Sequence, residues 1–252
     1  MSWGEWSTAP SLYFEHSFTY LGVGGTMFFL CLNVNETAWA VFYYGGENLV
    51  YEKIFKRLID VTVSFLGIVI LSPIMVLTAI AIKLESKGPI IFKQQRLGLN
   101  GKVFNIYKFR SMCVGAEKKG SGVYSGKNDN RVTKVGKFIR ATSIDELPQF
   151  INILKGDMSL IGPRPALTYH PWKYDEYTKE QKHMFDVRPG ITGWAQVNGR
   201  KEVEWPRRIE LNVWYVRHIS FLLDLKIFFL TIFKVFTNAD NVNTTETVKE
   251  KK

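Results

Sequence analysis

Two adjacent carboxylates, Asp145 and Glu146, lie in the segment SIDELPQF at positions 143–150. Carboxylates act as nucleophiles, as general acids or bases, and as ligands of hard metal ions. The backbone has two interpretations: Ser143 and Glu146 match a capping box, whereas Pro148 suits the first position of a helix that starts later. Either start places both carboxylates at a helix N-terminus, where free N–H groups favour ionised carboxylates and bind phosphate. A purely structural helix cap is the alternative to a catalytic pair.

Basic side chains flank these carboxylates in several motifs. In GPRP, at 162–165, Arg164 stands between two prolines that present its guanidinium rigidly, and a guanidinium suits bidentate contact with phosphate. Taken singly, each such cation is more often half of a surface salt bridge. Together they indicate a site for a phosphorylated ligand. The candidate phosphate-binding residues are Lys108, Arg110, Arg140, Arg164 and Arg200.

The distribution of charge also indicates an anionic partner. The 252 residues carry a formal net charge of +10, yet residues 1–52 contain no Lys or Arg, whereas residues 83–140 contain fourteen against three acidic residues. So concentrated a block favours nucleic acid, lipid headgroups or a phosphorylated substrate, with a solubilising basic face as the alternative. Nucleic acid is disfavoured, because a long apolar segment would have no purpose in such a protein.

That apolar segment precedes the basic block. Residues 61–82 are twenty-two consecutive uncharged residues, enough for a helix of about 33 Å. Cations flank both ends, which by the positive-inside rule keeps both ends cytoplasmic. In the middle, Pro73 lacks an N–H and kinks the helix, while the Ser72 hydroxyl can satisfy a freed carbonyl one turn back. We therefore expect a re-entrant helix; a Pro-kinked spanning helix and a buried core helix are the alternatives.

The elements around the candidate site predict a compact mixed α/β domain. Period-two alternation over 103–109 predicts a strand, the composition of 115–130 a loop, and 148–155 a helix that ends at Gly156. A helical region over 203–236 ends in an apolar stretch, 221–236, which three charged residues make more typical of an interfacial amphipathic helix than of a span. Residues 18–34 are a marginal span at best.

Composition bounds the class of protein. Apolar residues at 46% and charged residues at 22% disfavour wholesale disorder and a many-span membrane protein, and two cysteines exclude a disulfide scaffold. We expect an accessory segment over 1–52, a re-entrant membrane helix over 53–87, an α/β domain over 88–236 and a polar tail over 237–252. The expected fold class is mixed α/β, a compact membrane-associated domain with an N-terminal Pro-kinked re-entrant helix and interfacial amphipathic helices.

From about Lys53 to Phe236 the chain resembles the bacterial sugar transferase family, the monotopic phosphoglycosyl transferases that include undecaprenyl-phosphate galactose phosphotransferases. The resemblance rests on long motifs in a fixed order: KRLID, the Ser72-Pro73 break, GPIIFKQQRLGLNGKVFNIYKFRSM, TKVGKFIRATSIDELPQFINILKGDMSLIGPRP and RPGITGWAQVNGR. Ile144 stands where leucine is commoner in the family. Residues 1–52 have no counterpart in the minimal catalytic core.

The resemblance implies an enzyme that transfers a sugar 1-phosphate from a UDP-sugar to a polyprenyl phosphate such as undecaprenyl phosphate, releasing UMP, with Mg²⁺ as cofactor. The product would begin a bacterial surface glycan such as an exopolysaccharide, capsule, O-antigen or glycoprotein glycan. The implied location is the cytoplasmic face of the inner membrane, with downstream glycosyltransferases as partners and no role for nucleic acid. A non-enzymatic, anionic-lipid-binding scaffold of a glycan assembly complex is the alternative.

The resemblance also implies roles for individual residues. Asp145 would be the nucleophile that forms a phosphosugar-enzyme intermediate, and Glu146 its metal or acid/base companion. Arg140 would hold the phosphate of the lipid substrate. The basic residues of KFR and PRP would lie around the diphosphate of the donor, and both carboxylates would reach the magnesium ion.

Overall fold

The computed structural model describes residues 20–23, 26–29, 50–116, 129–199 and 204–236, and the chain divides into two units, Met1–Leu49 and Val50–Lys252. In the first unit, β1 (Tyr20–Val23) and β2 (Thr26–Phe29) pair antiparallel. These strands lie within residues 18–34, so the described part of that stretch is extended and not a membrane helix.

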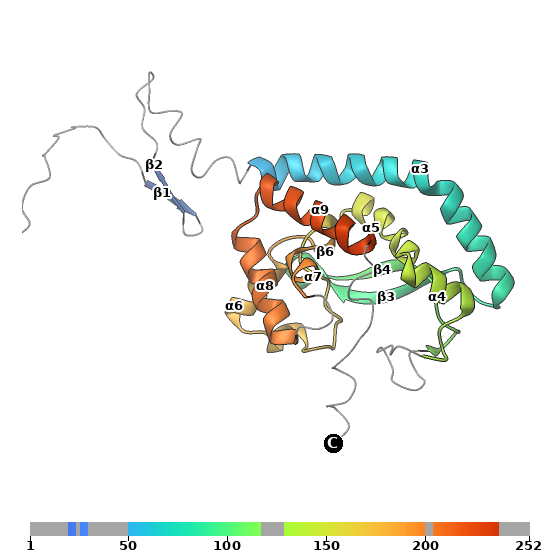
Figure 1. The fold of residues 1–252 in the computed structure, drawn as a ribbon. Helices are drawn as coiled ribbons and strands as arrows, with labels where there is room; N and C mark the ends of the chain where they lie inside the picture. Colours follow the sequence, from blue (N-terminus) through green and yellow to red (C-terminus); the bar gives the residue numbers. More distant parts are fainter. Residues whose placement is uncertain (1–19, 24–25, 30–49, 117–128, 200–203, 237–252) are drawn as a thin grey trace, which may run out of the picture. The chain divides into compact units, whose positions relative to one another are not determined.

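The second unit begins with a long apolar helix. A π-helical turn, Tyr51–Phe55, leads into α3 (Lys56–Glu85), which contains Pro73 and bends about midway along its length (Figure 1). The Ser72 hydroxyl donates a hydrogen bond of 2.8 Å to the carbonyl of Val69. That carbonyl is the one which the missing N–H of Pro73 leaves free, so the predicted compensation by Ser72 is present.

One face of α3 packs on the domain and the other is exposed. Met75, Ala79 and Ile82 pack against Phe109 and Ile139. Among the described residues, the helix that runs from Tyr51 to Glu85 is the one long and apolar enough to cross a membrane, and most of it is exposed. The exposed large apolar side chains of α3 are Leu58, Ile59, Val63, Phe65, Leu66, Val69, Ile70, Ile74, Val76, Leu77, Ile80 and Leu84.

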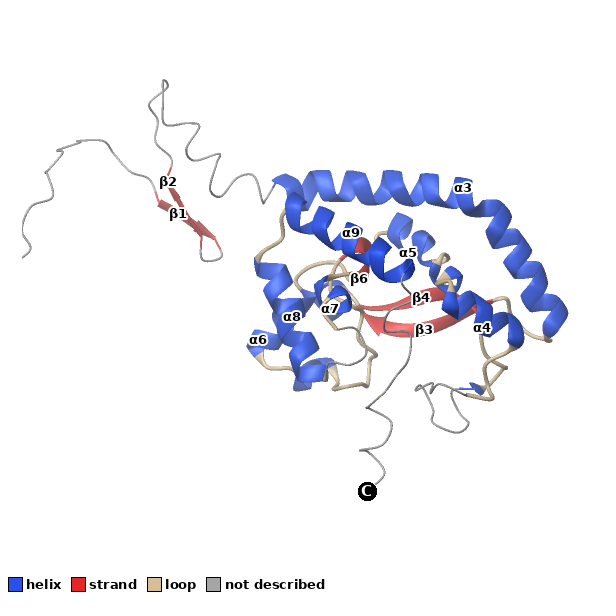
Figure 2. Ribbon diagram, viewed as in Figure 1, coloured by secondary structure: helices blue, strands red, loops and turns tan. Residues whose placement is uncertain are grey.

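Two small sheets lie beneath α3 (Figure 2). Strands β3 (Ile91–Leu97) and β4 (Val103–Phe109) pair antiparallel, and the predicted strand over 103–109 is confirmed. Strands β5 (Ser159–Ile161) and β6 (Gly190–Thr192) pair parallel. Helix α5 (Gln149–Lys155) lies between α3 and β4, packs Ile153 on Ile106, and ends as predicted at Gly156 with a positive φ of 89°.

Helices surround the sheets. They are α4 (Lys134–Ala141), α6 (Lys179–Lys182), α7 (Trp194–Val197), α8 (Trp205–Arg217) and α9 (Phe221–Phe236). The helical region expected over 203–236 is thus two helices, because residues 218–220 are not helical. Ser220 caps α9, since its hydroxyl accepts the N–H of Leu223 at 3.3 Å. The predicted loop at 115–130 lies mostly outside the described residues.

A buried polar network ties the start of α3 to α8 and α9. The Lys56 ammonium pairs with Asp224 at 2.5 Å, and the hydroxyls of Tyr51 and Tyr215 each donate to the same carboxylate at 2.7 Å. Lys56 and Asp224 are 9% and 4% exposed. Sequence reasoning treated Asp224 only as an interruption of an apolar stretch, whereas the fold uses it to neutralise a buried cation.

Candidate active site

Asp145 and Glu146 lie in a short 3-10 turn, Ile144–Glu146, that precedes α5. Ser143 enters the turn with a φ of 58° and its side chain makes no capping hydrogen bond, so the capping-box interpretation is wrong. Pro148 is the N-cap of α5, one residue outside the first helical position that the alternative assigned to it. The carboxylates are therefore presented by a turn ahead of the helix and do not serve as its cap.

Lys108 and Arg140 bring positive charge to this turn. The Lys108 ammonium, which projects from β4, pairs with Glu146 at 2.6 Å, and both side chains are about one-fifth exposed, at 19% and 22%. Arg140 lies in the last turn of α4, where its Nε donates to the Ser111 hydroxyl at 2.7 Å. The structure thus brings together four of the predicted site residues.

Burial is the main influence on the ionisation of Asp145. The pKa of Asp145 is raised to about 6, mainly by burial and also by the negative charge of Glu146, while the positive charges of Lys108 and Arg140 oppose the rise. Burial also lowers the pKa of Arg140, and the attraction of Asp145 opposes that shift. At neutral pH Asp145 is therefore an ionised but poorly solvated carboxylate, a state suited to nucleophilic attack.

A small pocket opens beside Glu146, and three of its nine lining residues are cations. Lys108, Arg96 and Arg164 line it together with Gln149, Pro165, Gly190 and Ile191. Sequence reasoning missed Arg96, whose position in the first long motif after the apolar segment was the available signal. The three cations make this region suited to contact with phosphate oxygens.

Close backbone packing fixes the loop that carries Arg164. The N–H of Gly162 donates to the carbonyl of Thr192 at 2.8 Å, and the N–H of Gly190 donates to the carbonyl of Pro163 at 2.9 Å. A Cβ at Gly193 would lie 2.0 Å from the carbonyl oxygen of Gly162. The GPRP loop is therefore held directly on β6 and the residue that follows it.

One predicted phosphate ligand, Arg110, lies away from this pocket. Arg110 is 5% exposed and donates to the carbonyls of Ser86 at 2.8 Å and Lys87 at 2.7 Å, so it closes the end of α3 and does not face the pocket. Lys108 lies within β4, whereas Arg110 follows the last residue of that strand, Phe109, so the alternation of the strand does not fix the direction of the Arg110 side chain. Arg200 lies outside the described residues.

The carboxylates fit only a lightly coordinated metal ion. In the described part of the chain no three His, Cys, Asp or Glu side chains gather as a metal cage. Asp145 and Glu146 are adjacent acidic side chains beside a phosphate-suited pocket. Magnesium commonly takes one or two carboxylates, several waters and substrate phosphate, and this donor set fits that pattern.

Comparison with known proteins identifies a family and several relatives of this chain. Residues 51–238 match the family model described as bacterial sugar transferase. The chain is 49% identical over 198 residues to the UDP-glucose:undecaprenyl-phosphate glucose-1-phosphate transferase of Klebsiella pneumoniae, a match that covers 77% of this chain and 42% of that protein. It is 45% identical over 185 residues to the UDP-N-acetylgalactosamine-undecaprenyl-phosphate N-acetylgalactosaminephosphotransferase of Aeromonas hydrophila, covering 72% and 44%.

A shorter relative is matched over most of its length. The uncharacterized sugar transferase EpsL of Bacillus subtilis (strain 168) is 47% identical over 186 residues, which cover 73% of this chain and 89% of EpsL. The chain thus spans less than half of the two larger relatives but nearly all of the smaller one.

Proposed function

This chain belongs to the bacterial sugar transferase family, and we propose that it transfers a sugar 1-phosphate from a UDP-sugar to undecaprenyl phosphate and releases UMP. The observation that carries the proposal is Asp145, a partly buried carboxylate with a raised pKa that lies near Lys108, Arg140 and a small pocket to which three cations contribute. The product would be the first lipid-linked intermediate of a surface glycan.

The proposed reaction has two steps at one carboxylate. A carboxylate oxygen of Asp145 attacks the phosphorus that bears the sugar, the anhydride bond to UMP breaks, and an aspartyl phosphosugar remains. A phosphate oxygen of undecaprenyl phosphate then attacks the same phosphorus and frees Asp145. One phosphoanhydride is exchanged for another, so an acyl phosphate of similar reactivity is a reasonable intermediate.

The cations of the pocket supply electrostatic stabilisation. Lys108 and Arg164 would neutralise the donor diphosphate, and Arg140 the incoming phosphate of the lipid. A magnesium ion held by Asp145 and Glu146 would, when bound, offset charge on the phosphoryl oxygens. Glu146 is held toward the pocket by Lys108, which supports a companion role for it and not nucleophilic attack.

The attachment of α3 supports a re-entrant membrane helix. Near its start, Arg57 donates to the carbonyl of Ile153 at 2.8 Å. At its end, Glu85 accepts the N–H of Lys134 at 2.6 Å. A straight helix across the bilayer would separate its two ends by about 30 Å on opposite sides, whereas here both ends are bound to the same domain.

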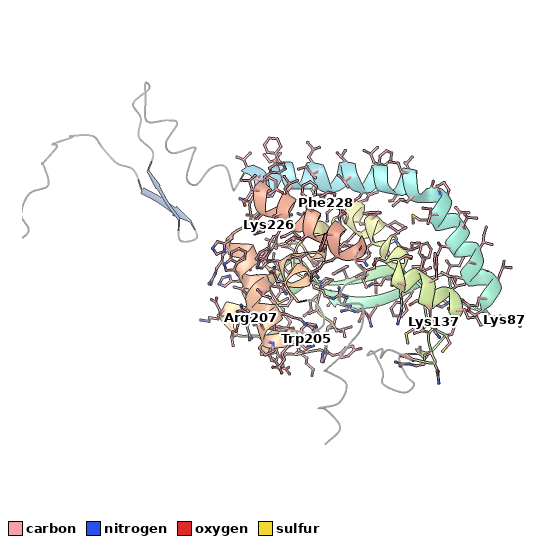
Figure 3. The ribbon with its side chains drawn as sticks, in the orientation of Figure 1. Lys87, Lys137, Trp205, Arg207, Lys226 and Phe228 are labelled. Carbon is pink, nitrogen blue, oxygen red and sulfur yellow. The ribbon has the colours of Figure 1, made fainter. Side chains whose placement is uncertain are left out.

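Helix α9 presents a second lipid-suited surface. Its exposed apolar side chains are Phe221, Leu222, Leu225, Phe228, Phe229, Ile232 and Phe233. Lys226 and Phe228 both project from this helix, and Lys87 and Lys137 lie near the far end of α3 (Figure 3). Apolar side chains beside cations suit an interfacial helix on an anionic leaflet. We place the domain on the cytoplasmic face of the inner membrane, where the phosphate of the lipid acceptor lies.

The topology has a direct test. In a protein whose two native cysteines are replaced by serine, single cysteines at Glu52 and at Lys87 should both react with an impermeant maleimide only from the cytoplasmic side. Pro73→Ala restores the main-chain hydrogen bond to Val69 and should move the label at position 87 toward the opposite side. Labelling of the unaltered helix from opposite sides would establish a spanning helix.

The reaction is tested with a panel of UDP-sugars, undecaprenyl phosphate and Mg²⁺. UMP release with at least one donor, dependent on the lipid phosphate for multiple turnovers, is the expected result. Failure of every donor, with anionic lipid binding retained, would favour the membrane scaffold. The proposed roles of the pocket residues concern phosphates and do not distinguish one sugar from another, so the panel also identifies the sugar.

A further inference from the structure

Helix α9 contacts the segment that holds the GPRP loop, and it does so at two points. The hydroxyls of Thr231 in α9 and Thr192 in β6 lie 2.8 Å apart. One and a half turns earlier, the Lys226 ammonium lies 5.5 Å from the centre of the Trp194 ring. Residues 192 and 194 flank Gly193, which packs closely on Gly162. Helix α9 therefore contacts both neighbours of Gly193 in the sequence.

The direction of the hydroxyl contact follows from the acceptors. Thr231 donates to the carbonyl of Ile227 in its own helix at 2.7 Å. A hydroxyl has one proton to donate, so Thr192 is the donor to Thr231. The carbonyl of Thr192 accepts the N–H of Gly162. A continuous path of hydrogen bonds and backbone contact therefore joins α9 to the loop that carries Arg164.

We propose that Thr231 is a positioning residue: through Thr192 it lets the lipid-facing helix α9 hold the GPRP loop in the geometry that binds the donor diphosphate. This inference rests on the proposed transferase function. Thr231 itself does not line the pocket. Its effect should therefore appear in donor affinity and not in the chemical step, because the loop supplies Arg164 while the attacking carboxylate comes from a separate turn.

The test uses valine, which matches the shape of threonine and lacks the hydroxyl. In nanodisc-embedded protein, Thr231→Val should raise KM for the UDP-sugar about three- to ten-fold, the effect of losing one neutral hydrogen bond, and leave kcat within about two-fold. Thr231→Ser should restore the wild-type KM. Thr78→Val is the matched control, because the Thr78 hydroxyl donates to Ile74 at 2.8 Å within α3, at the same i−4 spacing.

A second route tests the same contact if Thr231→Val does not fold. Thr192→Val removes the donor but leaves the Thr231 bond to Ile227 intact, and it should raise KM to the same extent. The double variant should be no worse than either single variant, since both remove one interaction. Equal KM values for Thr231→Val and Thr78→Val, or additive effects in the double variant, would overturn the inference.

Failure of the proposed function would look different. If the wild-type protein releases no UMP from any donor, the transferase assignment is wrong. Equilibrium binding of UDP to the same variants then decides on the positioning role by itself. Weaker binding by Thr231→Val, restored by serine and absent in Thr78→Val, would support it, and equal binding by all variants would refute it.

Discussion

Asp145→Asn is expected to abolish both turnover and the covalent phosphosugar adduct, with a loss of at least about 10³-fold in kcat. An amide has nearly the shape of a carboxylate but is a poor nucleophile, so the first step should fail while the pocket stays intact. Incubation with radiolabelled UDP-sugar and separation under denaturing conditions shows the adduct. A labelled band from the Asp145→Asn protein would refute the assignment of the nucleophile.

Glu146→Gln is the comparison variant. The substitution keeps the shape of the side chain that pairs with Lys108 but removes its charge. Turnover should fall through altered metal or proton handling, whereas some trapped adduct should remain, because Asp145 is still present. Equal loss of adduct in both variants would mean that the two carboxylates do not have separate roles.

Stability distinguishes a catalytic loss from a folding defect. Burial raises the pKa of Asp145 to about 6 from 3.8, so protonated Asp145 stabilises the fold below about pH 4 and this contribution is lost as the pH rises through 6. In magnesium-free buffer at pH 7.5, Asp145→Asn should therefore be more stable than wild type, by about 1 to 2 kcal/mol after discounting for partial exposure. The difference in unfolding free energy should vanish near pH 4. A variant less stable than wild type at pH 7.5 would indicate a structural role.

Asp224→Ala is expected to lower the free energy of unfolding by about 3 to 5 kcal/mol, because it leaves the Lys56 ammonium buried without its partner. The same change deprives the hydroxyls of Tyr51 and Tyr215 of their acceptor. Chemical or thermal unfolding of detergent-solubilised protein measures the loss. We also expect α9 to lose its fixed attachment to the start of α3.

Two further variants set the scale for Asp224→Ala. Arg207 and Glu210 form an ion pair on the surface, with side chains that are 64% and 62% exposed. Glu210→Ala removes this pair and should change the free energy of unfolding by less than about 1 kcal/mol. Combining Asp224→Leu with Lys56→Met removes both charges and should recover much of the loss. Equal effects of Asp224→Ala and Glu210→Ala would show that the Lys56 pair is not effectively buried.

The elements predicted best from sequence were those with a strong local signal. The alternation over 103–109 became β4, and the Ser72-Pro73 pair behaved as its chemistry required. The turn at Asp145 was predicted less well. Local rules allowed two helix starts, and the structure adopts a 3-10 turn with Ser143 in the left-handed region, which tertiary packing selects over both.

Pairings across long sequence separations were beyond local reasoning. Arg110 and Arg140 look alike in the sequence, yet one binds the carbonyls at the end of α3 and the other lies near Asp145. The partner of Lys56 lies 168 residues away. Charge clustering therefore indicated the region in which Lys108 and Arg140 lie near the two carboxylates, while the partner of each cation depended on which distant element lay beside it.

The long separation between Lys56 and Asp224 also has a consequence during synthesis of the protein. Lys56 leaves the ribosome 168 residues before Asp224, which at ordinary bacterial elongation rates is a delay of about 10 to 30 s. Throughout this interval the first turn of α3 holds an ammonium group without its carboxylate, at the edge of an apolar helix. A chain that stops short of α9 never acquires that carboxylate. Because α9 is the last of the described helices to be made, the buried ion pair at the start of α3 forms only after that helix has been synthesised.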